Sequence, residues 1–254
     1  MTAATVLATA LVAAPALAVF AYGLATALDT GLGAVPFAFV RTISPRAVAV
    51  ANAVAAGLML GACFGLAAAG TRYGAWQTIA GANLGVLFIL ATQRWLGRHD
   101  VRFGAAGGVE ARRMVLMVVV MTVHSFAEGV AVGAAFGGGV ELATVITIAI
   151  AVHNVPEGLA ISAVLRPRGT SLAACAGWSV FSSLPQPLMA VPAFLFVEAF
   201  RPALPWGLGF AAGAMVFMVF VELLPEAYED APRPAIGLLA SLTLVAMLLF
   251  QRTL

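Results

Sequence analysis

Val145-Ile-Thr-Ile-Ala-Ile-Ala-Val-His-Asn-Val-Pro-Glu-Gly-Leu-Ala-Ile-Ser162 is an apolar run that carries His153, Asn154 and Glu157 in its second half. A run of this length and composition predicts a helix that crosses a membrane. Residues four apart lie on one face of a helix, so the imidazole of His153 and the carboxylate of Glu157 project side by side. Ionisable side chains are costly inside lipid unless they face a partner, an ion or water. The stretch therefore indicates both the fold class and the place of a functional site.

A second apolar stretch repeats this pattern earlier in the chain. His124-Ser-Phe-Ala-Glu128-Gly129 has the same His-x-x-x-Glu-Gly spacing. Ser125 stands where the later stretch has Asn154, and each lies three residues before its Glu and so shares its helix face. A single His in an apolar helix is more often a hydrogen-bonded core residue. Four ionisable groups in matched pairs instead predict one shared site.

The composition places the whole chain in a membrane. Of 254 residues, 62% are hydrophobic and only 9% are charged, and the mean hydropathy is +1.03. These values predict an all-α polytopic membrane protein, an eight-transmembrane-helix bundle that forms a single transmembrane domain over residues 1–254. The expected helices lie near 5–28, 47–69, 74–96, 112–136, 140–164, 171–197, 206–225 and 235–251.

The arginines predict the orientation of this bundle. All 13 basic residues are Arg, and the alternation of the predicted helices places ten of them on one side and three on the other. The larger group consists of Arg41, Arg46, Arg94, Arg98, Arg102, Arg112, Arg113, Arg166, Arg168 and Arg233. Because cytoplasmic loops carry the excess of positive charge, both termini are expected outside the cytoplasm. A net charge of +2 gives no indication of nucleic-acid binding.

The residue types in the paired motifs indicate a transition metal. Imidazole nitrogen and carboxylate oxygen together suit Zn²⁺ and similar cations such as Fe²⁺, Cd²⁺ or Mn²⁺, whereas Mg²⁺ and Ca²⁺ prefer oxygen alone. Pro156 removes one backbone donor and leaves the carbonyl of Val152 free at the centre of the later motif. Irregular helix geometry at membrane depth is tolerated where it lines a cavity or a site.

At these residues the chain resembles the ZIP (Zrt/Irt-like) family of divalent-metal transporters. The stretch from Val152 to Ser162 is similar to the family's His-Asn-x-Pro-Glu-Gly motif on its fifth helix, and eight crossings with both termini outside agree with what the family implies. The resemblance extends to Gly57-Leu-Met-Leu-Gly61, and to Ala211-Ala-Gly-Ala-Met215 through Glu222-Leu-Leu-Pro-Glu226.

The resemblance implies two metal positions. The first would be made by His124, His153 and Glu157, with Met59 where some bacterial members have a thioether ligand. The second would use Ser125, Glu128, Asn154 and Glu157, with Glu157 bridging. Ser125 stands where many members have Asn, and Gln186 stands where some relatives supply a carboxylate. Both departures weaken the second position.

Transport of Zn²⁺ or a similar divalent cation, without an enzymatic activity, is the function that these features indicate. Two other functions stay open: an intramembrane metal-dependent hydrolase, and a proton-coupled carrier of an organic solute that uses the His/Glu pairs as relays. The expected partners are the metal ion and the lipid bilayer of a prokaryotic inner membrane, and a homodimer is left open. The connection at 97–111 offers only His99, Asp100 and Glu110, too few for a metal-sensing element.

Overall fold

The computed structural model describes residues 3–40, 42–98 and 109–253, and every regular element in these ranges is helical. The elements are α1 (Ala3–Thr30), η1 (Gly31–Ala38), α2 (Pro45–Arg98), α3 (Val109–Gly138), α4 (Val140–Leu165), η2 (Arg166–Arg168), α5 (Leu172–Ser183), α6 (Pro185–Ala199), η3 (Arg201–Ala203), α7 (Leu204–Met218), η4 (Val219–Leu223), α8 (Leu224–Asp230) and α9 (Arg233–Thr253).

The lengths and surfaces of these helices are those of a membrane protein. Within the described ranges, six helical stretches are long and apolar enough to cross a bilayer. α9 shows the outward face of such a helix, because Leu238, Leu242 and Leu249 lie on one side of it and are 57–62% exposed. Polar side chains such as His153 and Glu128 are instead fully buried. Apolar residues face outward and ionisable ones inward, so the predicted class, an all-α membrane protein, is confirmed.

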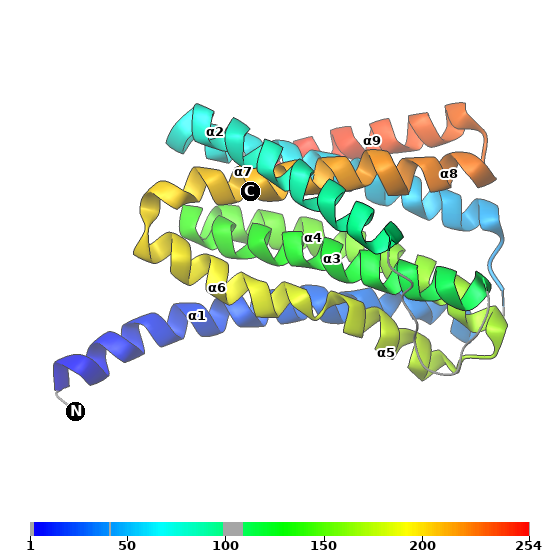
Figure 1. Cartoon of the computed structure of the whole chain (residues 1–254), viewed down its shortest axis with the longest axis horizontal. Helices are drawn as coiled ribbons and strands as arrows, with labels where there is room; N and C mark the ends of the chain where they lie inside the picture. Colours follow the sequence, from blue (N-terminus) through cyan, green and yellow to red (C-terminus); the bar gives the residue numbers. More distant parts are fainter. Residues whose placement is uncertain (1–2, 41, 99–108, 254) are drawn as a thin grey trace.

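α2 is the element that differs most from the sequence expectation. Its apolar stretch Pro45–Trp95 has 51 residues, which at ~1.5 Å per residue would reach ~77 Å if straight, more than twice a bilayer core. The only non-helical residue inside it is Gly74, whose φ of 173° and ψ of 103° are extended. Figure 1 shows that the ribbon of α2 reverses direction and returns along the bundle. The predicted helices 47–69 and 74–96 are its two arms, and the expected loop between them shrinks to this one residue.

Prolines interrupt two other predicted helices. The range 171–197 is divided into α5 and α6 at Leu184, directly before Pro185. The range 206–225 consists of α7, a π-helical turn at η4, and α8, with Pro225 near the start of α8. Proline lacks the N–H that would continue the hydrogen-bond ladder, so each helix adjusts its pitch or stops there. α4 is a single helix although it contains Pro156.

The bundle places α3 and α4 in its centre. In Figure 1, α1, α5 and α6 lie along one side of this pair, and α2, α7, α8 and α9 lie along the other. The main apolar core joins the two sides, with Met59 of α2, Val132 of α3, Ile150 of α4 and Met215 of α7 all buried in it. Cys63, a free thiol, belongs to the same core. α3 and α4 therefore have neighbours on both sides, and residues of α4 such as Ile148 and Val152 stay exposed between them.

Glycine lets two neighbours approach the central pair closely. A methyl group at Gly158 of α4 would lie 1.7 Å from the carbonyl oxygen of Thr30, at the end of α1. One at Gly129 of α3 would lie 2.6 Å from the carbonyl oxygen of Gln186 in α6. Both distances are far below any tolerated contact with backbone. The Gly that ends each His-x-x-x-Glu-Gly motif is thus a helix contact point.

We expect Gly158→Ala to lower the stability of the folded protein by about 1–3 kcal/mol or more, because the backbones of α1 and α4 must separate to admit the methyl group. Thermal unfolding of the purified protein in detergent measures this. Gly177→Ala is the matched control, since a methyl group there meets nothing within 4 Å, and it should keep or slightly raise the melting temperature. Equal melting temperatures for the two variants would contradict this close packing.

Candidate metal centre

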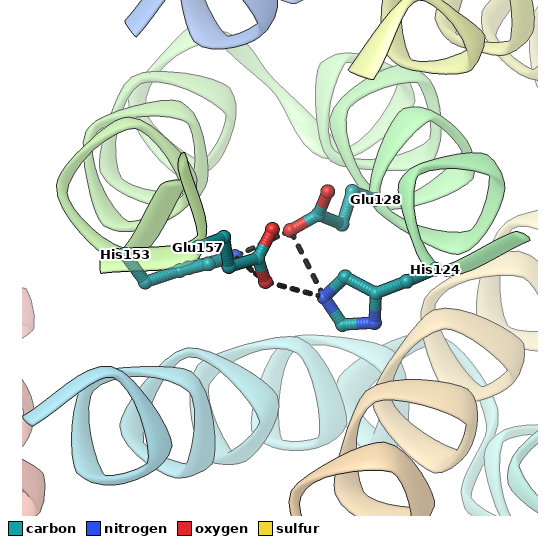
Figure 2. A group of neighbouring side chains, drawn as sticks. All are labelled: His124, Glu128, His153 and Glu157. Carbon is teal, nitrogen blue, oxygen red and sulfur yellow. Dashed lines mark hydrogen bonds and ion pairs between the residues drawn. The ribbon is translucent and has the colours of Figure 1, made fainter. Parts of the chain in front are cut away.

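The two motifs meet where α3 and α4 pack side by side. His124 and Glu128 project from α3, and His153 and Glu157 project from α4. Figure 2 shows the two carboxylates and the His124 ring converging in the space between these helices, with the His153 ring reaching in from α4. All four side chains are at most 3% exposed. The structure brings together the ionisable residues of the paired motifs, as their matched spacing predicts.

One ligand atom from each residue lies within reach of a single ion. The best-placed atoms of the four side chains all lie within 4.8 Å of one another. His124 Nε2 is 2.9 Å from Glu157 Oε1 and 3.4 Å from Glu128 Oε1. His153 Nε2 is in direct contact with Glu128 Oε1 and lies 4.0 Å from Glu157 Oε1. Two nitrogens and two oxygens around one point are a four-coordinate donor set of the kind that Zn²⁺ takes.

The backbone of α4 orients one of the imidazoles. His153 Nδ1 lies 3.0 Å from the carbonyl oxygen of Ala149, one turn earlier in the same helix. A carbonyl only accepts hydrogen bonds, so Nδ1 carries the proton and donates it. In the neutral ring this leaves the lone pair on Nε2, the atom that faces the carboxylates. Such a hydrogen bond is the usual way in which a protein holds a metal-binding His.

Some polar atoms next to the four residues are hydrogen-bonded, and others have no partner. Asn154 Nδ2 donates to the carbonyl oxygen of Thr26 in α1 at 2.7 Å and to Gln186 Oε1 in α6 at 3.1 Å. Gln186 Nε2 in turn donates to Glu128 Oε2. By contrast, Ser125 Oγ and Asn154 Oδ1 are buried without a hydrogen-bond partner. The structure thus places Asn154 and Gln186 against the centre in a hydrogen-bonded chain.

Other residues singled out in the sequence have different surroundings. Met59 is fully buried in the apolar core together with Ile150 and Met215. Its role as a ligand stays a prediction. Of the sparse 97–111 connection, His99 and Asp100 lie outside the described residues.

Sequence reasoning missed the two backbone carbonyls that support the centre, those of Thr26 and Ala149. Every residue has a carbonyl, so no residue type marks these two. There was also no sign in the sequence that two glutamates pair with α2. Glu222 of η4 accepts a hydrogen bond from Gln93 Nε2 at 2.7 Å, and Glu226 of α8 accepts one from Asn52 Nδ2 at 3.3 Å. Both donors lie on α2, and their short amide side chains gave no signal of this pairing.

The electrostatics of the centre favour a divalent cation. Two carboxylates buried among apolar helices would carry two uncompensated negative charges, which the surrounding core cannot solvate. In the described residues nearest to them, the balancing groups are imidazoles and neutral amides, with no Arg in direct contact. One divalent ion bound by the four atoms would neutralise both charges.

Comparison with known proteins gives an independent result. The model of the ZIP zinc transporter family matches residues 104–249. The chain is 42% identical over 230 residues to a putative zinc transporter of Arabidopsis thaliana. This aligned region covers 89% of the present chain but only 37% of the plant protein. It is 31% identical over 255 residues to the zinc transporter ZupT of Corynebacterium glutamicum, with 90% and 97% of the two chains covered. It is 34% identical over 235 residues to the zinc transporter ZIPB of Bordetella bronchiseptica, with 86% and 76% covered.

We expect His153→Ala to weaken equilibrium Zn²⁺ binding by at least about 100-fold, because it removes a ligand atom. Mutating a residue that only hydrogen-bonds to a metal ligand already lowers metal affinity by ~10–100-fold. Equilibrium dialysis of purified protein against buffered Zn²⁺ measures this. His99→Ala removes the one histidine outside the paired motifs and serves as the control, with unchanged affinity. If both variants bound Zn²⁺ as the unmodified protein does, the centre would not be the binding site.

Proposed function

Since the chain belongs to the ZIP family of zinc transporters, we propose that it moves Zn²⁺ or a similar divalent cation across a membrane. The observation that carries this proposal is the enclosed set of two imidazoles and two carboxylates between α3 and α4. A soluble protein could bind zinc in many ways. Ionisable ligands in the interior of an apolar bundle instead lie on the path of an ion that crosses it.

The chemistry of this transport is ligand exchange. The cation sheds its water and is held by His124, Glu128, His153 and Glu157, and it leaves when the helices around the site open toward the other side. A site on a transport path must release its ion, so its affinity must be limited. Carboxylates and imidazoles that also hydrogen-bond to one another keep alternative partners when the ion departs, which favours reversible binding.

The donor set supports Zn²⁺ first, with Cd²⁺, Fe²⁺ and Mn²⁺ as further candidates. Nitrogen from two imidazoles disfavours Mg²⁺ and Ca²⁺, which take oxygen ligands. The three relatives reported above are named zinc transporters. Purified protein in metal-free liposomes that enclose a fluorescent metal indicator would rank these four ions directly.

The arrangement in the membrane that we propose has eight crossings. The two arms of α2 count as two, α5 and α6 together as one, and α7 with α8 as one. Both termini then lie outside the cytoplasm, because the ten-to-three distribution of arginines places the Arg-rich loops inside. A prokaryotic inner membrane, with lipid around the bundle, is the proposed location.

The competing functions have less support. A metal-dependent hydrolase needs an open coordination position reached by substrate, but the four side chains of the centre are at most 3% exposed. Their spacing also differs from the His-Glu-x-x-His pattern of metalloproteases. A proton-coupled carrier of an organic solute has no counterpart among the three relatives reported above, which are named zinc transporters.

We expect Glu157→Gln to abolish divalent-metal flux into liposomes while the folded protein is recovered in normal yield. The amide keeps the size of the side chain but removes a negative charge that the ion needs. Glu141→Gln is the matched control, since Glu141 lies in the first turn of the same helix and is exposed. Wild-type flux in Glu157→Gln would rule out the proposed path.

We expect flux to rise as the pH on both sides of the membrane is raised together from acidic to neutral. Protons compete with the metal for imidazole nitrogens and carboxylate oxygens, so a lower proton concentration frees the ligands. Initial rates at a constant free Zn²⁺ concentration measure this. A rate that climbs steadily on acidification would favour the proton-driven carrier.

A further inference from the structure

Gln186 lies against the centre but is turned toward Glu128 as a hydrogen-bond donor. It occupies the first turn of α6 and is fully buried. Its Nε2 donates to Glu128 Oε2, and its Oε1 accepts from Asn154 Nδ2. Gln186 therefore uses both ends of its amide to connect α6 with α3 and α4.

Asn154 determines which way this amide faces. Its two N–H groups are both used, one by Gln186 Oε1 and the other by the carbonyl oxygen of Thr26. The carbonyl of Thr26 can only accept, so the nitrogen of Asn154 must point toward it. Because Gln186 Oε1 accepts from Asn154, the other end of the Gln186 amide, Nε2, has to face the carboxylate of Glu128. Turned over, the Gln186 amide would set its oxygen against the oxygen of Glu128 and its N–H₂ against the N–H₂ of Asn154.

The two oxygens of Glu128 consequently have different roles. Oε1 faces Nε2 of both His124 and His153 and belongs to the four-atom set. Oε2 is satisfied by the Gln186 amide, a neutral donor that occupies the place where another cation would have to bind. The centre holds two carboxylates, which one divalent ion neutralises, and Gln186 adds no further negative charge. Among the described residues, no further carboxylate belongs to the four-atom set, so nothing within that set would balance the two positive charges that a second ion adds.

We propose that Gln186 is a positioning residue, which presents Glu128 Oε1 to the metal and restricts the centre to a single divalent ion. The inference rests on the proposed function, because it concerns the same centre. The buried oxygens Ser125 Oγ and Asn154 Oδ1 lack partners and are the ligands that a second ion would use. Both are neutral, and two neutral oxygens beside a carboxylate oxygen already bonded to Gln186 form a much weaker set than the first.

The test is the number of ions bound per chain at neutral pH, measured by elemental analysis after equilibrium dialysis of the full-length protein against buffered Zn²⁺. The unmodified protein should bind one ion. Gln186→Met keeps the length of the side chain and removes the donor, so it should still bind one ion. The affinity should fall about 10–100-fold, which is the usual loss when a hydrogen-bond partner of a metal ligand is removed. Gln186→Glu places a third carboxylate opposite Glu128 Oε2 and should bind two ions.

One variant is the control for these measurements. Gln251→Glu adds a carboxylate at an amide that donates to the carbonyl oxygen of Gly61 in α2, and it should keep one ion at unchanged affinity. Melting temperatures of all variants identify any that fail to fold. In that case Gln186→Asn, which keeps the amide, gives a second measure of the donor's effect on affinity.

Each outcome decides the inference. Two ions in the unmodified protein that fall to one in Gln186→Met would overturn it and make Gln186 a ligand. Unchanged affinity in Gln186→Met would also overturn it, because Glu128 would then need no positioning. One ion bound with no Zn²⁺ flux in liposomes would contradict the proposed transport function and leave the single-ion centre supported.

Discussion

The burial of two carboxylates inside an apolar helix bundle is the constraint on which the arrangement depends. Glu128 and Glu157 lie where lipid and core side chains offer no solvation, and an unbalanced charge there would cost several kcal/mol or more. Several polar groups near them contribute to offsetting that cost. The imidazoles of His124 and His153 contact the carboxylate oxygens, the Gln186 amide bonds to Glu128, and backbone carbonyls hold these groups in place. A divalent cation bound by the four side chains would complete the balance.

Close packing makes this constellation possible. The outer sides of α3 and α4 pack closely against neighbouring helices. The glycine that follows each Glu permits this close packing, since Gly158 contacts the end of α1 and Gly129 contacts the start of α6 with no room for a side chain. Each motif therefore combines two roles at adjacent positions. The Glu faces inward to the candidate metal centre, and the Gly faces outward to the neighbouring helix.

The supporting hydrogen bonds connect distant parts of the chain. Asn154 of α4 is bonded to Thr26 of α1 and to Gln186 of α6, and Gln186 is bonded to Glu128 of α3. Four helices thus meet through side-chain amides at the depth of the centre. On the other side of the bundle, α2 is joined to the segment after α7 by Asn52 and Gln93, which donate to Glu226 and Glu222. Amides serve as neutral connectors in both places, so they add no charge to the interior.

The apolar composition by itself determined the membrane class and the helical content, because in a bilayer core only helices and closed barrels satisfy the backbone, and these runs are long enough for helices. The spacing of His124, Glu128, His153 and Glu157 likewise determined that each pair shares a helix face, since the period of the helix is local. Only the tertiary structure decided what those faces meet. The contact of Gly158 with Thr30, the contact of Gly129 with Gln186 and the direction of the Gln186 amide all depend on which helix lies alongside. Such contacts join residues far apart in the chain, and no local pattern encodes them.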